Sequence, residues 1–241
     1  MSGHSKWHNI QQRKGKQDAK RGNLFSMYAK KIALAARSGG DQATNFSLRL
    51  LVEKARAVAM PKDNIDRAIK RGSGEDKDVA QIEECMYEGY GPGGIALLIK
   101  TVSDNKNRTV SDVKHILSSH GGSMGGAGSV VWMFSEWGEV RIKSEDLRLK
   151  IDDEFQLNII EAGAEDISVE EDEVYIKTKM EHLQNVVKKL KELGVENLES
   201  GLAWIAKDKV PTTPELQEKL STLFSALEEN EDIDEYFTNA D

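Results

Sequence analysis

The chain of 241 residues has 33 Lys and Arg against 41 Asp and Glu, and 39% of its residues are hydrophobic. Cys85 is its single cysteine, which excludes an intramolecular disulfide and is typical of a reducing compartment. The longest apolar runs, at 95–99 and 130–134, are far too short to span a bilayer. We therefore expect a cytoplasmic protein of two or three domains, with neither a signal peptide nor a membrane partner.

Charge is unevenly distributed along the chain. Residues 1–71 contain 16 Lys and Arg and 5 Asp and Glu, a net charge of +11, whereas residues 72–241 carry a net charge of −19. Such asymmetry favours nucleic acid as the partner of the basic part. The alternative is that the basic and acidic parts of the chain attract each other. That would explain why the two parts dock together, but not why basic side chains crowd a segment with little apolar pattern.

The N-terminal third of the chain predicts a basic arm followed by a helical domain. Residues 1–22 show no helical or strand periodicity and are expected to be extended. Three segments with apolar residues at helical spacing follow, at 23–40, 44–60 and 61–74. In the third, Asp63 is the expected N-cap and Gly72 the expected stop. Three short helices with tight connections predict a compact helical domain over about 23–72.

The next part, beyond a linker at 72–84, alternates between strands and helices. Two strands are predicted around the Gly-Pro-Gly-Gly turn within 85–104. A helix follows in 107–122, with Thr109 or Ser111 as its cap. The apolar run at 129–134 is expected to be a buried strand.

The C-terminal part contains a recognisable order of elements. From about 137 to 206 the order is β-α-β-β-α-β, that of a ferredoxin-like unit. A last helix starts at Pro214, and the acidic residues 228–241 are expected to form a solvated tail. A sharper hypothesis is that this tail competes with phosphate for the basic arm, so that its deletion tightens nucleic-acid binding.

The basic side chains of the arm and helices are the candidate nucleic-acid-binding residues. Lys and Arg neutralise phosphates and release counterions, and a Trp among them can stack on unpaired bases. The alternative, a solvated and disordered tail, is usual for an arbitrary charge run, but here the run continues onto the helices. The candidates are Lys6, Trp7, Arg13, Lys14, Lys16, Lys20, Arg21, Lys30, Lys31, Lys62, Arg67, Lys70 and Arg71. The spacing of Arg67, Lys70 and Arg71 places them on one helix face.

Signals for catalysis or metal binding are weak. Gly121 to Gly125 satisfy G-x-S-x-G around Ser123, but a helix precedes this segment and a strand follows, the reverse of the context in which that motif works. His4 and His8 have no third ligand nearby. No dinucleotide fingerprint or P-loop is present. We therefore expect no enzyme activity, cofactor, metal or small-molecule substrate.

Several stretches together resemble the YebC/PmpR family, whose mitochondrial relative is the translational activator of cytochrome oxidase. They are GHSKWHNIQQRKGKQDAKRG, MPKDNIDRAIKRGSG, YEGYGPGGIALL, DNKNRTVSDVKHILSSHGGSMG and GSVVWMF. The resemblance implies an α+β fold of three domains around a central cleft. These are an all-helical domain at 1–78, a middle α/β domain at 79–134 plus 207–241, and an inserted ferredoxin-like domain at 135–206. The family often has Pro where Phe46 stands and Asn where Ala59 stands.

Two functions remain open. The resemblance implies a DNA-binding transcriptional regulator, or else a translation factor that acts on stalled ribosomes. The basic positions that match the family are Lys6, Arg13, Lys14, Lys20 and Arg21 in the arm and Lys62, Arg67, Lys70 and Arg71 in the third helix. That helix offers phosphate-type side chains but no base-reading set, and an arm containing Trp7 suits folded RNA. The residues alone thus slightly favour ribosomal RNA over DNA as the partner.

Overall fold

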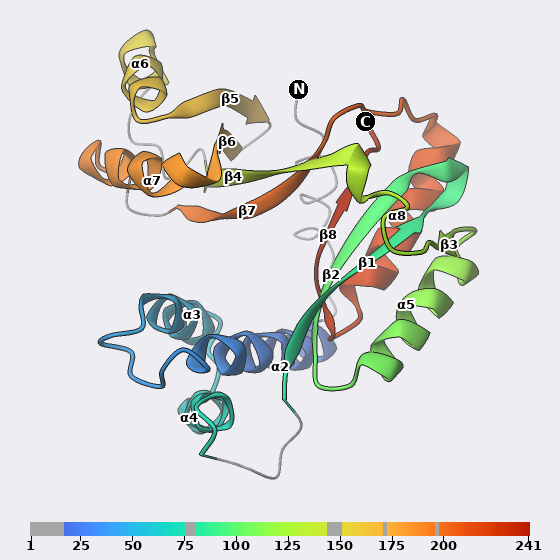
Figure 1. Cartoon of the computed structure of the whole chain (residues 1–241), viewed down its shortest axis with the longest axis horizontal. Coiled ribbons are helices and arrows are strands. Elements are labelled where there is room, and N and C mark those ends of the chain that lie inside the picture. The colour runs from blue at the N-terminus through green and yellow to red at the C-terminus, as the bar shows by residue number, and fades with distance from the viewer. Residues whose placement is uncertain (1–16, 76–80, 144–150, 171–172, 196–197) are drawn as a thin grey trace. The chain divides into compact units, whose positions relative to one another are not determined.

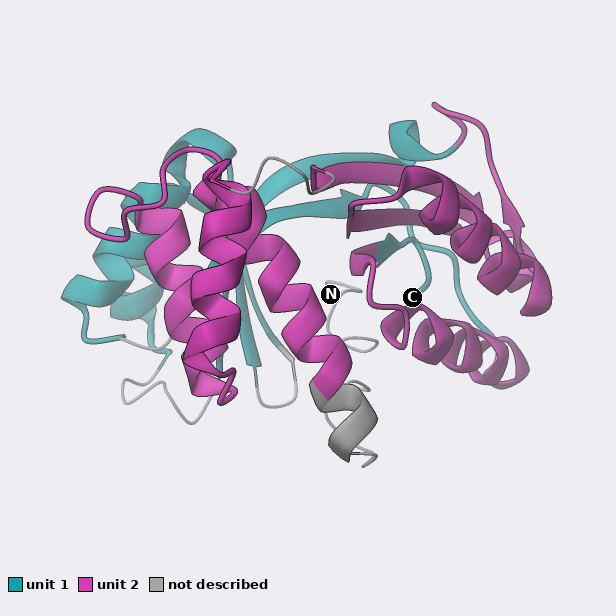
Figure 2. Cartoon of the chain, turned by 90° about the horizontal axis from the view of Figure 1, so that it is seen from below, with its two compact units in different colours: residues 1–10, 130–212, 237–241 teal, residues 11–129, 213–236 magenta. Residues whose placement is uncertain are grey.

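The computed structural model describes residues 17–75, 81–143, 151–170, 173–195 and 198–241 (Figure 1). They divide into two compact units (Figure 2): one lies within 130–212 and 237–241, and the other within 17–129 and 213–236. The described residues form two four-stranded antiparallel sheets accompanied by helices, so the fold is α+β as expected. The division into three domains and the central cleft remain predictions.

A three-helix bundle opens the larger unit, as predicted. Its helices are α2 (Gln17–Ala36), α3 (Phe46–Ala57) and α4 (Lys62–Gly72). They share a core of fully or nearly buried side chains, namely Ile32, Ala36, Leu48, Val52, Ala55, Met60, Ile65 and Ala68. The extended arm is wrong for residues 17–22, which form the start of α2. Ala, Lys, Arg and Gln favour helix even without an apolar stripe; residues 1–16 lie outside the described part.

The starts of α3 and α4 differ from what the sequence suggested. Asn45 caps α3, because its side-chain oxygen accepts a hydrogen bond from the backbone N–H of Leu48 at 3.0 Å. Asp63 is not the N-cap of α4: it lies inside the first turn, after Pro61. There its carboxylate is near the positive end of the helix dipole, which is favourable without a capping bond.

Ala59 ends α3 in a conformation that suits glycine. Its φ is 60°, the one positive φ of a non-glycine residue among the described residues. The N–H of Met60 bonds to the Ala55 carbonyl and that of Ala59 to the Arg56 carbonyl, both at 2.9 Å, which is the Schellman pattern. Where α4, α5 and α7 end in the same way, the equivalent position is glycine: Gly74, Gly121 and Gly194.

Replacing Ala59 with glycine or asparagine is therefore expected to stabilise the bundle. A left-handed conformation destabilises a residue with a Cβ by about 1–2 kcal/mol, and glycine avoids this cost. Glycine also loses more conformational entropy on folding than alanine, which offsets part of the gain. The net gain is about 0.5–1 kcal/mol, measurable as a higher midpoint of denaturant unfolding. Ala57→Gly, at the last residue of the same helix, is the matched control and should lower the midpoint, with a loss of stability of up to about 1 kcal/mol. A lower midpoint for Ala59→Gly would contradict the argument.

The sheet of the larger unit has the order β3-β1-β2-β8. Strands β1 (Glu83–Tyr90) and β2 (Ala96–Ser103) flank the turn at Pro92–Gly94, as predicted, and Tyr90 pairs with Ala96. Helix α5 (Lys106–Ser119) is capped by Asn105, so Thr109 and Ser111 are not its caps. The remaining elements are β3 (Ser123–Met124), α8 (Pro214–Glu228) and β8 (Ile233–Thr238).

The acidic C-terminus is not a solvated tail. Residues 233–238 form an edge strand of the sheet, and Ile233 and Phe237 are buried. Ile233, Tyr236 and Phe237 are the apolar residues of this strand, and acidic residues stand between them. Deleting 228–241 would remove a strand, so that deletion cannot isolate a competition between the tail and phosphate.

The sheet of the smaller unit has the order β5-β6-β4-β7, and every neighbouring pair is antiparallel. Helices α6 and α7 pack together on one face of it, where Phe155, Ile159, Val186 and Leu190 meet the strands. This is the predicted β-α-β-β-α-β order. Its elements are β4 (Phe134–Lys143), α6 (Asp153–Glu161), β5 (Ala164–Glu170), β6 (Glu173–Thr178), α7 (Leu183–Glu192) and β7 (Glu199–Ala206).

The predicted strand at 129–134 is wrong. Val131–Met133 form a short 3-10 helix, and β4 begins only at Phe134. Val130 is fully buried whereas Trp132 is 61% exposed, so the apolar run does not lie in one buried layer. No helix in the described ranges is long and apolar enough to cross a bilayer.

Candidate nucleic-acid interface

Seven of the thirteen candidate side chains are not described. Lys6, Trp7, Arg13, Lys14 and Lys16 lie outside the described residues. Lys20 and Arg21 lie in the first turns of α2, where the structure describes the backbone alone. The structure therefore bears on the six candidates of the helical bundle.

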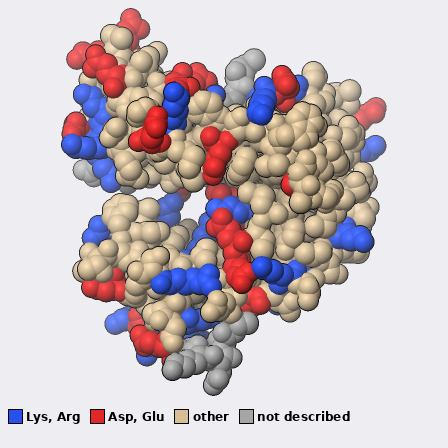
Figure 3. All heavy atoms as spheres, viewed as in Figure 1, with Lys and Arg blue, Asp and Glu red and all other residues tan. Residues whose placement is uncertain are grey.

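Lys62, Arg67 and Lys70 are exposed side chains of α4. The inner face of this helix carries Ile65 and Ala68, which pack into the bundle core. Among the residues that the structure describes, no carboxylate lies within ion-pair distance of these three cations. On the face shown in Figure 3, Lys and Arg side chains stand out at several places over the bundle, at lower left. These cations remain available to phosphates.

Arg71 differs from these three cations, because it has a carboxylate partner. Its guanidinium Nη2 lies 2.9 Å from Oδ2 of Asp104, and about a quarter of its side chain is exposed. The spacing of Arg67, Lys70 and Arg71 predicts one shared basic face, but only two of the three side chains are available on it. Arg71 is turned toward the residues before α5, whereas Arg67 and Lys70 face solvent.

Lys30 and Lys31 also have partners within the fold. The Lys30 Nζ donates to Asp232 Oδ1 at 2.5 Å and to the Glu231 carbonyl at 2.9 Å. Lys31 forms an ion pair with Asp234, which is nearly buried. Burial lowers the pKa of Lys31, but the carboxylate of Asp234 outweighs this and raises it above the usual value. Both lysines are therefore engaged before any ligand arrives.

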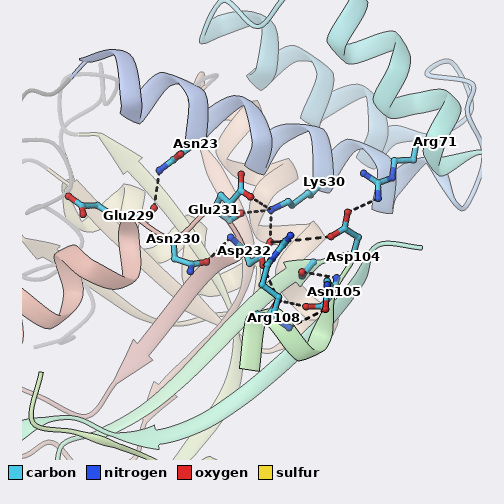
Figure 4. Close-up of polar contacts among 12 residues, drawn as sticks. Asn23, Lys30, Arg71, Asp104, Asn105, Arg108, Glu229, Asn230, Glu231 and Asp232 are labelled. Carbon is cyan, nitrogen blue, oxygen red and sulfur yellow. Dashed lines mark hydrogen bonds and ion pairs between the residues drawn. The ribbon is translucent and has the colours of Figure 1, made fainter. Parts of the chain in front are cut away.

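Asp232 is the buried centre of a polar network (Figure 4). Its side chain is 2% exposed and lies in the short turn between α8 and β8. Arg108 donates to both carboxylate oxygens, at 3.1 and 3.0 Å, and the Thr109 hydroxyl donates to Oδ2 at 2.9 Å. Together with Lys30, these groups bind the carboxylate from α2 and from the first turn of α5.

The balance of forces keeps Asp232 ionised. Burial raises the pKa of its carboxyl, but the hydrogen bonds from Lys30, Arg108 and Thr109 outweigh it, so the pKa lies below the usual value. The same contacts raise the pKa of Arg108. The network is completed by Asp104, which accepts from Arg71 and lies 3.5 Å from Arg108. It joins α2 and α4 of the bundle to the sheet of the same unit.

Sequence reasoning missed the members of this network. Asp104, Asn105, Arg108 and Thr109 all fall in DNKNRT, a stretch quoted for the family resemblance, in which only Thr109 was given a role, as a helix cap. Asn105 caps α5 and so fixes Arg108 and Thr109 beside the carboxylate. A dense polar run at the start of a helix was the available signal.

Ser123 does not stand on a strand-to-helix turn. It lies in the short strand β3, which follows α5 and pairs with β1 through Tyr90. The described residues contain no group of three or more His, Cys, Asp or Glu that could hold a metal ion. His4 and His8 lie outside the described part.

Comparison with known proteins gives a family for the whole chain. The TACO1/YebC protein N-terminal domain matches residues 5–75, and the TACO1/YebC second and third domain matches residues 82–240. The chain belongs to the TACO1/YebC family. The YebC resemblance of the sequence is thereby confirmed.

Several known proteins are similar to this chain over nearly their whole length. A probable transcriptional regulatory protein of Maridesulfovibrio salexigens is 47% identical over 100% of this chain and 96% of its own. One of Latilactobacillus sakei is also 47% identical, over 99% of this chain and 97% of its own. The crystal structure of a conserved hypothetical protein from Aquifex aeolicus matches with a TM-score of 0.84 and 36% identity. The matched region covers 98% of this chain and 97% of the Aquifex aeolicus chain.

Proposed function

We propose that this protein is a non-enzymatic regulator of gene expression that acts in the cytoplasm by binding nucleic acid. The observation that carries the proposal is the set of exposed cations on α4, Lys62, Arg67 and Lys70, which have no carboxylate partner among the described residues. The names of the relatives, probable transcriptional regulatory proteins, support regulation of transcription as the level of action.

Phosphate contacts supply the binding free energy. Each Lys or Arg that neutralises a phosphate releases counterions, so affinity falls with salt and depends little on sequence. The three most exposed of the basic side chains on α4, Lys62, Arg67 and Lys70, are of the kind that contacts phosphates. Lys30, Lys31 and Arg71 contribute less, because each already holds a carboxylate. The arm residues Lys6, Trp7, Arg13, Lys14, Lys16, Lys20 and Arg21 remain part of the proposal.

Removing two of these cations tests the proposal. In Arg67→Gln/Lys70→Gln, the slope of log affinity against log salt for a duplex DNA fragment should become shallower by about 1.8, since each contact contributes about 0.9. At 0.1 M salt the affinity should fall about 10- to 100-fold. Fluorescence anisotropy of labelled DNA across a salt series measures both quantities.

The control removes the same charge elsewhere on the same unit. Lys114→Gln/Lys219→Gln changes two exposed lysines of α5 and α8. It should leave the slope and the affinity close to those of the unchanged protein. Equal losses in both variants would show that net charge, and not the α4 surface, governs binding. Ribosomal RNA run as a competitor tests the alternative of a translation factor, since displacement of DNA at equal nucleotide concentration would favour it.

A further inference from the structure

Phe46 and Arg49 form an exposed pair at the start of α3. Phe46 is 58% exposed. The guanidinium carbon of Arg49 lies 5.2 Å from the centroid of the Phe46 ring. Residues three apart share a face of a helix. Since Leu48 and Val52 face the core, the pair lies on the outer face. A lone exposed apolar side chain is ordinary, but an exposed ring next to a planar cation is a chemical feature of its own.

The pair stands on a fixed piece of backbone. The side-chain amide of Asn45 donates to the carbonyls of Ala35 and Gly39, at 2.9 and 2.8 Å. Its oxygen accepts from the N–H of Leu48. The start of α3 is thereby tied to the end of α2, and the ring immediately after Asn45 is presented from a rigid support. A ligand that stacks there has little backbone ordering to overcome.

We propose that Phe46 and Arg49 form a stacking site for an unpaired base of single-stranded RNA. This proposal rests on the proposed function. Aromatic rings and guanidinium planes are the surfaces on which unpaired bases stack, and such stacking tolerates any base. A duplex keeps its bases paired and stacked, whereas RNA exposes bases in loops and single strands. The site therefore selects unpaired RNA over duplex nucleic acid.

Charge on the bundle fits the same ligand. Arg49 and Arg56 are exposed on α3, and the free cations of α4 belong to the same three-helix bundle. A strand with one base on Phe46 thus finds cations for its phosphates. Glu53 is the exposed carboxylate of this outer face.

The experiment compares a single-stranded oligoadenylate with an RNA duplex of equal length, both labelled, in the same salt. Phe46→Ala should weaken binding of the single strand about fivefold to tenfold, the lower part of the range for base stacking. It should leave binding of the duplex unchanged. Leu50→Ala removes exposed apolar surface on the same face without a ring and should change neither. Because Phe46 is exposed, its replacement should also leave the unfolding midpoint unchanged.

The outcomes separate this site from the proposed function. If the unchanged protein binds both probes and Phe46→Ala binds the single strand equally well, the stacking site is wrong and phosphate binding stands. If the unchanged protein binds duplex DNA but neither RNA probe, this inference fails and the proposed function stands; if it binds none of the three, both fail. If oligodeoxyadenylate is bound as tightly as oligoadenylate, with the same dependence on Phe46, the assignment to RNA is overturned.

Discussion

Replacing Asp232 with asparagine is expected to lower the free energy of unfolding by about 3 kcal/mol, the size typical when one partner of a buried ion pair is removed. Asparagine has almost the same shape, so the change removes charge and not volume. It leaves Lys30, whose side chain is 11% exposed, beside an amide instead of a carboxylate. An amide also places a donor where Arg108 or Thr109 needs an acceptor.

An exposed ion pair provides the control for Asp232. Glu192 pairs with Lys188 one turn away on α7, and the side chains are 56% and 79% exposed. Such pairs contribute about 0.3–0.5 kcal/mol, so Glu192→Gln should scarcely move the unfolding midpoint. Denaturant unfolding followed by circular dichroism measures both variants. Equal midpoints for Asp232→Asn and the unchanged protein would show that the network does not stabilise the fold.

The loss of unfolding free energy caused by Asp232→Asn should also depend on pH. The pKa of Asp232 is lower in the folded protein than in the unfolded chain. A depressed carboxyl pKa contributes stability that is present above the unfolded value, about 3.9, and is lost as pH falls through the folded value. The difference in stability between the two proteins should therefore be largest near neutral pH and shrink in acid. A difference that stays constant down to the acid limit would mean that the charge of Asp232 is not responsible.

Asp232 shows why the sequence could not predict this network. Its run, EENEDIDEYF, is acidic enough to indicate a solvated tail, and its few apolar residues show no alternation that would predict a strand. Burial of a carboxylate depends on cations brought from α2 and α5, far away in the chain. Local composition carries no information on such a partner. The same long-range pairing explains why Lys30 and Lys31 looked like free phosphate-binding residues.

Elements with strong local patterns were predictable. The three helices of the bundle and the β-α-β-β-α-β order follow from apolar spacing, and the observed strand order agrees with it. The turn at Pro92–Gly94 followed from its glycines. Where an apolar run gave no period, as at Val131–Met133, the prediction failed, because a short run fits a buried strand and a 3-10 turn equally well.

Replacing Gly72 with alanine is expected to destabilise the bundle by about 2 kcal/mol or more, within or above the range for overpacked cores. The sequence suggested that Gly72 stops α4, but it is the last residue of that helix and packs against α2. A Cβ there would lie 2.0 Å from the carbonyl oxygen of Ala33 and 2.7 Å from the Cβ of Ala36. These atoms belong to helix backbone and to a side chain without rotamers, so neither can move aside alone.

The sign of this effect distinguishes close packing from helix propensity. Alanine is more favourable than glycine inside a helix by about 1 kcal/mol, so propensity alone predicts that Gly72→Ala stabilises. Gly22 is the matched control, because it lies within α2 and a Cβ there meets no atom within 4 Å. Gly22→Ala should therefore raise the unfolding midpoint while Gly72→Ala lowers it. If both substitutions raise the midpoint, α2 and α4 tolerate a wider separation, and Gly72 does not set their approach.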